Sequence, residues 1–145
     1  MNQIVIAAGG TGGHVFPAAT LAAELKARGH DIHVLTDHRG LRYMSAFQGA
    51  PFTEIGAGGV VGKSIIYRAR SAIAILRGIF QARQELKKLR PAAVVGFGGY
   101  PSVPPLIAAW SLGIPTLLHE QNAVIGLANR PVSYTHLTLP TTSRV

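Results

Sequence analysis

The segment from Gly9 to His14 combines residues that can hold a phosphate with a side chain that can accept a proton. Four glycines surround Thr11, after a short apolar run and before an Ala- and Leu-rich stretch. Glycine lets backbone amides approach a phosphate closely, and the start of a helix adds free N–H donors and a partial positive charge. Four glycines among five residues exceed what a tight turn without a ligand needs. The segment therefore predicts a phosphate-binding loop, with Gly10 among the candidate contacts.

His14 stands at the predicted start of the helix that follows this loop. The positive end of a helix favours the neutral imidazole, which is the form that acts as a general base. The alternative is a histidine that only caps the turn by hydrogen bonding. No spacing among the six Asp and Glu residues indicates a carboxylate dyad, and His119 and Glu120 lack a third ligand for a metal. We therefore predict His14 as the candidate general base and expect no metal.

The loop alone leaves the phosphate compound open. Gly10-Thr11-Gly12 begins the dinucleotide fingerprint, and Asp37, after the second apolar run, is placed to hold a ribose. However, the third glycine of that fingerprint would fall at Val15, which carries a side chain. A nicotinamide-dinucleotide-binding Rossmann domain of an oxidoreductase is thus the alternative of a different class. No Lys-Ser/Thr pair follows the glycines, which excludes a P-loop.

Apolar runs and glycine turns predict a doubly wound, Rossmann-like α/β fold with a parallel sheet in one domain. Gly29 marks the end of the first helix, Pro17 falls in its first turn, and Gly78 is a weak point of the second helix. The expected strands are 4–8, 31–36, 52–55, 92–95 and 115–118, and the expected helices are 14–28, 64–89 and 102–112.

Two further polar or glycine-rich segments follow predicted strands, at 96–100 and 119–122. Ligands of such sheets bind outside the carboxyl ends of the strands, so these segments should meet the first glycine loop at one edge. The additional candidate substrate contacts are Gly98, Gly99, Tyr100, His119, Glu120 and Gln121.

Positive charge is concentrated in the second long helical stretch. The chain has a net charge of +8, and residues 60–90 contain eight Lys or Arg residues against Glu85 alone. Such a patch attracts phosphate groups of lipids, nucleotides or nucleic acid. Nucleic acid is disfavoured because Ile and Leu, rather than stacking aromatic residues, lie between the basic residues. No uncharged apolar run reaches the roughly 18–20 residues of a membrane span, and no secretory signal is visible, so we expect a soluble or membrane-surface protein.

The same helical stretch has two apolar stripes. The first, Ile75, Ile79, Ala82 and Leu86, should face the sheet. The second lies at least roughly 100° around the helix and should stay partly exposed, either on an anionic membrane or against the glycine-rich loop or a second domain. We favour the membrane, with Trp110 on the next helix as an interfacial anchor. The predicted membrane patch consists of Ile66, Ile73, Leu76, Phe80 and Trp110 with Arg70 and Arg77.

Three motifs together resemble glycosyltransferase family 28: GGTGGHVFPA (9–18), GFGGY (96–100) and HEQNAVIGLANR (119–130). The resemblance implies the N-terminal half of a GT-B fold. It implies an inverting transfer of N-acetylglucosamine from UDP-N-acetylglucosamine to lipid I, which gives lipid II for peptidoglycan. Lipid I is undecaprenyl-pyrophosphoryl-N-acetylmuramoyl-pentapeptide, so the enzyme is expected at the cytoplasmic face of the inner membrane. No organic cofactor is implied.

Carried over by motif, Thr11, Gly12, Gly13 and Asn122 are expected to contact the donor substrate, and His14 to deprotonate the acceptor hydroxyl. The N-terminal domain of the family handles mainly the acceptor, so an isolated half is expected to be inactive. The resemblance covers residues 1–130. The Thr/Ser/Pro-rich segment 131–145 carries no helical stripe, and we interpret it as a non-native tail from a truncated or misjoined reading frame.

Overall fold

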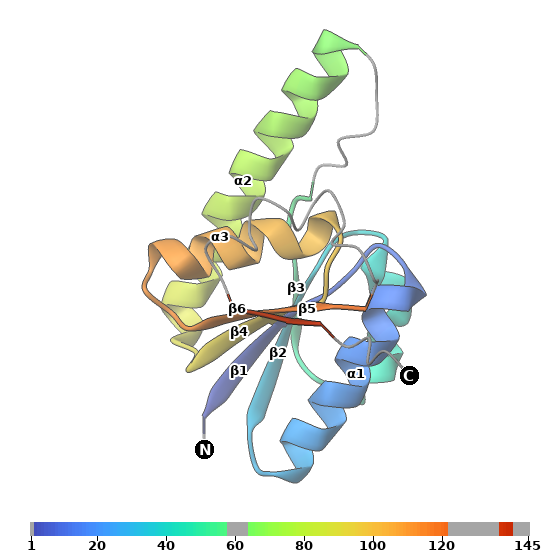
Figure 1. Cartoon of the computed structure of the whole chain (residues 1–145), viewed down its shortest axis with the longest axis vertical. Coiled ribbons are helices and arrows are strands. Elements are labelled where there is room, and N and C mark those ends of the chain that lie inside the picture. The colour runs from blue at the N-terminus through green and yellow to red at the C-terminus, as the bar shows by residue number, and fades with distance from the viewer. Residues whose placement is uncertain (1, 58–63, 122–136, 141–145) are drawn as a thin grey trace.

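A parallel β-sheet of six strands forms the centre of the protein, in the order β3-β2-β1-β4-β5-β6 (Figure 1). The computed structural model describes residues 2–57, 64–121 and 137–140. The strands are β1 (Gln3–Ala7), β2 (Asp31–Thr36), β3 (Phe52–Glu54), β4 (Ala93–Gly96), β5 (Thr116–Glu120) and β6 (Leu137–Pro140). Every pair of neighbours is parallel. The predicted doubly wound α/β fold is confirmed.

Helices cover both faces of the sheet (Figure 1). Helix α1 (Gly12–Ala27) and the 3-10 segment η1 (Gly40–Phe47) pack on one face, and α2 (Ile65–Leu89) and α3 (Val103–Ser111) pack on the other. On β1, Ile6 joins the core under α1 while its neighbour Val5 joins the core under α2 and α3, and both are fully buried. Burial on both faces favours apolar residues along a strand, which explains the apolar run from Ile4 to Ala8 at the start of the chain.

Helix α1 lies close to the sheet because small side chains line its inner face. Ala18, Ala19 and Ala22 are buried there. The helix ends where expected, since Gly29 adopts a φ of +84° and its N–H donates to the Lys26 carbonyl. The expected start was wrong, however. The helix begins at Gly12 instead of His14, so Pro17 lies in its second turn.

Helix α2 differs between its two ends. Its C-terminal half packs on the sheet through Ala82 and Leu86, whereas its first turns project beyond the sheet (Figure 1). The predicted inner stripe is confirmed at these two positions, but Ile75 and Ile79 are only half-buried. In the described part of the chain, every helix is too short or too polar to span a bilayer.

Gly78 has a packing role that the sequence analysis missed. A Cβ at this position would lie 1.9 Å from the Gly56 carbonyl oxygen, so only glycine lets α2 touch the segment after β3. Gln81, one turn further, accepts a hydrogen bond from the Gly56 N–H at 2.9 Å. The position is therefore a close contact between α2 and the segment after β3, and the lower helix propensity of Gly78 stays a prediction.

Residues 137–140 form the edge strand β6 beside β5, where no structure was expected. The domain boundary that we placed at residue 130 is not tested by this pairing and stays a prediction.

Candidate functional site

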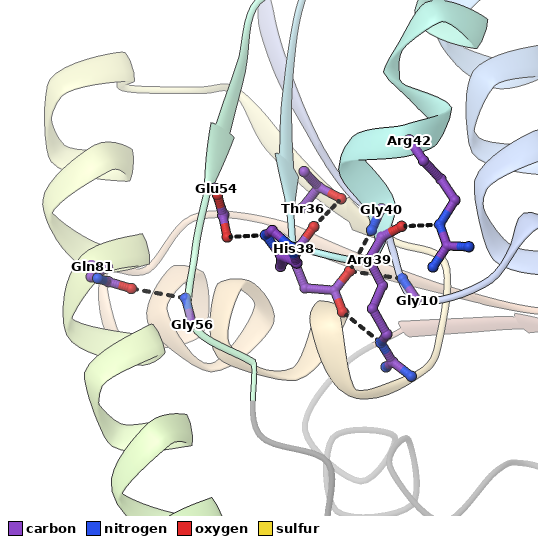
Figure 2. A network of polar contacts seen from close by, with 10 residues as sticks. Gly10, Thr36, His38, Arg39, Gly40, Arg42, Glu54, Gly56 and Gln81 are labelled. Atoms are coloured by element: carbon purple, nitrogen blue, oxygen red, sulfur yellow. Dashed lines mark hydrogen bonds and ion pairs between the residues drawn. The ribbon is translucent and has the colours of Figure 1, made fainter.

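Asp37, which directly follows β2, holds the glycine loop through hydrogen bonds to backbone N–H groups, and its partners Gly10, Arg39 and Gly40 are labelled in Figure 2. Its carboxylate accepts hydrogen bonds from the Gly10 N–H at 2.8 Å and the Gly40 N–H at 3.0 Å. The Nε of Arg39 donates to its second oxygen at 3.2 Å. Asp37 is almost fully buried, so its carboxylate serves the loop and does not face a ligand.

Packing and backbone conformation account for part of the glycine content of this loop. A Cβ at Gly9 would lie 2.4 Å from an oxygen of Asp37, and Gly10 has a φ of +75°, which side chains disfavour. A Cβ at Gly12 would meet the Phe16 ring at 2.9 Å. At Gly13, by contrast, the nearest atom among the described residues would be 3.7 Å away, and no positive φ applies. Within the described part of the chain, neither packing nor conformation explains why Gly13 carries no side chain.

The side chain of Arg39 lies beside the loop that Asp37 supports. One terminal nitrogen of its guanidinium lies 3.4 Å from the position of a Cβ on Gly10. The Nε is engaged by Asp37, and this bond fixes the direction of the side chain while about half of it stays exposed. The arrangement places a positive charge next to the N-terminus of α1, whose first amides have no intrahelical acceptor.

His14 is the point at which the three predicted loops meet. It lies on the first turn of α1, and its Nδ1 is 2.9 Å from the carbonyl oxygen of Phe97, which follows β4. The same Nδ1 is 2.7 Å from Nε2 of Gln121, which follows β5. The other ring nitrogen, Nε2, faces Gly99, where a Cβ would approach it to 3.3 Å. The convergence expected at the carboxyl ends of the strands is thus present in the structure.

Most of the other candidate residues lie on the glycine loop or at the ends of β4 and β5. Gly98 and Gly99 both adopt positive φ, which shapes the turn into η2 (Tyr100–Ser102), and Tyr100 is half-buried. The His119 ring packs against Phe97 with ring centroids 4.8 Å apart. Glu120 is buried. Thr11 is exposed at the mouth of the loop, and Asn122 lies outside the described residues.

Burial lowers the pKa of His119, while the charge of Glu120 and the side chain of Gln121 oppose that shift. A lowered pKa keeps this imidazole neutral near pH 7. His119 therefore adds an aromatic, uncharged side chain beside Phe97 instead of a second cation.

The predicted membrane patch is exposed. The exposed fractions are 72% for Ile66, 56% for Ile73, 66% for Leu76, 63% for Phe80 and 58% for Trp110. Arg70 and Arg77 are also exposed on α2. Arg83 donates a hydrogen bond to the Ser111 hydroxyl and so connects α2 to α3, the helix that carries Trp110. Large apolar side chains rarely remain this exposed together unless they contact a partner.

The dinucleotide alternative finds no support at this site. Val15, where the third glycine of the fingerprint would stand, is fully buried in the core under α1. Asp37, the expected ribose ligand, is already engaged by two backbone amides and Arg39. The sequence could not distinguish a ribose ligand from a loop anchor, because both place an acidic residue at the end of the second strand.

Comparison with known proteins agrees with this geometry. A relative from Sinorhizobium medicae (strain WSM419) is 49% identical over 127 residues, which are 88% of this chain and 34% of that protein. A relative from Agrobacterium fabrum is 48% identical over 135 residues, 92% of this chain and 36% of that protein. Both are named UDP-N-acetylglucosamine–N-acetylmuramyl-(pentapeptide) pyrophosphoryl-undecaprenol N-acetylglucosamine transferase. The chain thus spans about a third of the length of these relatives.

Solved structures give the same result. The crystal structure of Acinetobacter baumannii MurG aligns with a TM-score of 0.85 and 36% identity over 99% of this chain and 42% of that one. The calicheamicin glycosyltransferase CalG4, at 17% identity and a TM-score of 0.61 over 93% of this chain and 36% of that one, shares the fold alone. Residues 4–139 match the family described as the glycosyltransferase family 28 N-terminal domain. The chain therefore belongs to glycosyltransferase family 28, of which it contains the Rossmann-like N-terminal half of the GT-B fold.

Proposed function

We propose that this chain is the acceptor-side half of an enzyme that transfers N-acetylglucosamine from UDP-N-acetylglucosamine to lipid I and so forms lipid II. The observation that carries the proposal is the meeting of the glycine loop, the turn after β4 and the end of β5 around the His14 imidazole. The names of the relatives, at 48–49% identity, support the same substrates. The donor half is expected in the part of the relatives that this chain does not span.

The glycine loop is proposed to hold the diphosphate of the donor, UDP-N-acetylglucosamine. Gly13 leaves room for close approach, the first amides of α1 have no acceptor within the helix, and the Arg39 guanidinium lies beside Gly10. Thr11, Gly12, Gly13 and, beyond the described residues, Asn122 are the proposed contacts. A cation next to free amides offsets the charge of the phosphates better than the amides alone.

His14 is proposed as the general base. When Nδ1 carries the proton and donates a hydrogen bond to the Phe97 carbonyl, Nε2 keeps its lone pair on the side of Gly99. Nε2 then takes the proton of the acceptor hydroxyl as its oxygen bonds to the anomeric carbon. The bond from that carbon to the UDP oxygen breaks on the opposite side, which inverts the configuration. The Phe97 carbonyl stabilises the resulting imidazolium.

The exposed apolar side chains of α2 and α3 are proposed to dock on anionic lipid at the cytoplasmic face of the inner membrane. The polyprenyl tail of lipid I must stay in the bilayer while its acceptor hydroxyl reaches His14. Arg70 and Arg77 add attraction to anionic headgroups, worth about 1 kcal/mol for each residue near the surface.

A chimera tests the proposed reaction. Residues 1–130 would be joined to the C-terminal two-thirds of the Sinorhizobium medicae relative, and transfer of radiolabelled N-acetylglucosamine to lipid I would be measured. Formation of lipid II by the chimera is expected. A folded chimera that binds UDP-N-acetylglucosamine but transfers no sugar, beside an active parent enzyme, would contradict the proposal.

A further inference from the structure

Pro17 leaves one carbonyl group of helix α1 without its usual donor. Proline has no N–H, so the carbonyl of Gly13, four residues earlier, receives no hydrogen bond from within the helix. The side chain of Gln121 fills this gap, since its Nε2 donates to the Gly13 carbonyl at 2.9 Å. A residue 108 positions away thus completes the second turn of α1.

This bond fixes the orientation of the Gln121 amide. A carbonyl can only accept, so the nitrogen end of the amide must face α1. The oxygen end is buried, and no group among the described residues donates a hydrogen bond of standard geometry to it. The Gln121 side chain does raise the pKa of His119, against the larger lowering by burial. Rotating the amide by 180° would place two acceptors against each other at the Gly13 carbonyl.

The fixed nitrogen of Gln121 also lies 2.7 Å from Nδ1 of His14, whose other neighbour is the Phe97 carbonyl at 2.9 Å. These two neighbours require opposite protonation of Nδ1. Gln121 can only donate, which suits a bare Nδ1 and places the proton on Nε2. The Phe97 carbonyl can only accept, which suits a protonated Nδ1 and a bare Nε2.

We infer that Gln121 is a positioning residue that sets the tautomer of His14, because its amide, held at the carbonyl that Pro17 leaves free, competes with the Phe97 carbonyl for Nδ1. This inference rests on the proposed role of His14 as the base. In the ligand-free protein Gln121 holds the proton on Nε2, where His14 cannot accept another. A ligand oxygen that draws the Gln121 N–H away releases His14 to the tautomer that acts as a base.

The tautomer can be observed directly in this chain by nitrogen-15 NMR of the imidazole rings at a pH where they are neutral. The His14 signals are assigned by their loss in His14→Gln. We expect the wild-type protein to carry the proton on Nε2. Gln121→Leu removes the donor and Gln121→Glu replaces it with an acceptor, so both should move the proton to Nδ1. Gln84→Leu, on the exposed face of α2, is the matched control and should change nothing.

Pro17→Ala provides an independent variant, because the new backbone N–H can satisfy the Gly13 carbonyl and release Gln121. Its His14 tautomer should shift partly toward Nδ1–H, and it keeps the inference testable if a Gln121 variant fails to fold. The same tautomer in all of these folded proteins would overturn the inference. The proposed reaction is judged separately, since the chimera measures sugar transfer and the NMR experiment measures proton position without catalysis.

Discussion

The edge of the sheet around the glycine loop and the projecting half of α2 have opposite physical characters. At the edge, backbone groups and buried polar side chains are connected by specific hydrogen bonds, as Asp37 illustrates with three donors. The first turns of α2 present Ile66, Ile73 and Leu76 to solvent and lie away from the sheet (Figure 1). Hydrogen bonds are directional, so they fix the positions of the groups they join. The hydrophobic effect is non-directional, so exposed apolar side chains gain only a general affinity for an apolar phase.

The contrast fits two different roles, with proton transfer at the edge of the sheet and adsorption to a membrane at α2. A proton transfer needs a nitrogen at a defined place, so a single change at the edge should have a large effect on turnover. Adsorption to a bilayer sums many weak contributions, so the projecting half should respond gradually to change.

The largest effect is expected at His14. In the chimera, His14→Ala should lower kcat by about 10²–10⁴-fold with little change in KM, because a base acts mainly in the transition state. Steady-state kinetics with both substrates would measure this. An unchanged kcat with a raised KM would make His14 a binding residue.

Asp37 should be the main stabilising residue of the edge. Asp37→Ala leaves two loop amides without an acceptor and should lower the free energy of unfolding by about 2–4 kcal/mol. Asp37→Asn keeps a neutral acceptor for those amides and should cost less than the alanine variant. Urea denaturation of the three proteins gives the comparison, and equal stability of all three would show that the loop does not depend on the carboxylate.

The exposed apolar side chains of α2 should govern adsorption without affecting the fold. Changing Ile73, Leu76 and Phe80 together to Ser removes apolar area that a bilayer would cover and should weaken binding to anionic vesicles by about tenfold or more. Phe52→Ser, which alters an exposed aromatic residue on β3, is the matched control. Co-sedimentation measures binding and circular dichroism checks the fold. Equal binding by the triple variant would leave only the basic charge as a cause of adsorption.

Gly13 should separate stability from binding within the edge itself. Gly13→Ala places a better helix former in the first turn without a clash and should raise the free energy of unfolding by up to about 1 kcal/mol. The new methyl group would occupy the space left for the donor diphosphate, so the KM of the chimera for UDP-N-acetylglucosamine should rise. A more stable variant with unchanged KM would remove Gly13 from the binding site.

The smallest effect is expected for the segment after residue 130. We propose that residues 131–145 are not part of the native domain, so deleting them should leave the melting temperature nearly unchanged. Two observations favour the opposite result, namely the pairing of β6 with β5 and the family match that extends to residue 139. A clear fall in melting temperature would extend the domain beyond residue 130.

The elements of the fold could be predicted from the sequence because they depend on local periodicity. Apolar runs between glycine turns located β1, β2, β4 and β5, and Gly29 located the end of α1. The 3-10 segment η1 was missed, since eight residues without a long apolar stripe give no helical signal.

The partners within the site could be predicted only in part. Motifs placed His14, Gly99 and Gln121 at one edge, but they could not show that Gln121 reaches the Gly13 carbonyl. That contact depends on an absent N–H at Pro17 and on the distance between two strands, neither of which leaves a pattern in nearby residues. Asp37 was misinterpreted for a similar reason, because its two amide donors come from different loops.

The contact between Gly78 and Gly56 fixes α2 at one point along its length. There the helix backbone meets the segment after β3, and the hydrogen bond of Gln81 holds the same contact one turn further on. The turns before Gly78 extend away from this contact, so a force on Ile66 acts about three helical turns from the point where the helix is fixed. Substituting alanine for Gly78 would favour an isolated helix but would break the contact with Gly56. The first turns of α2 would then lose their fixed angle to the sheet.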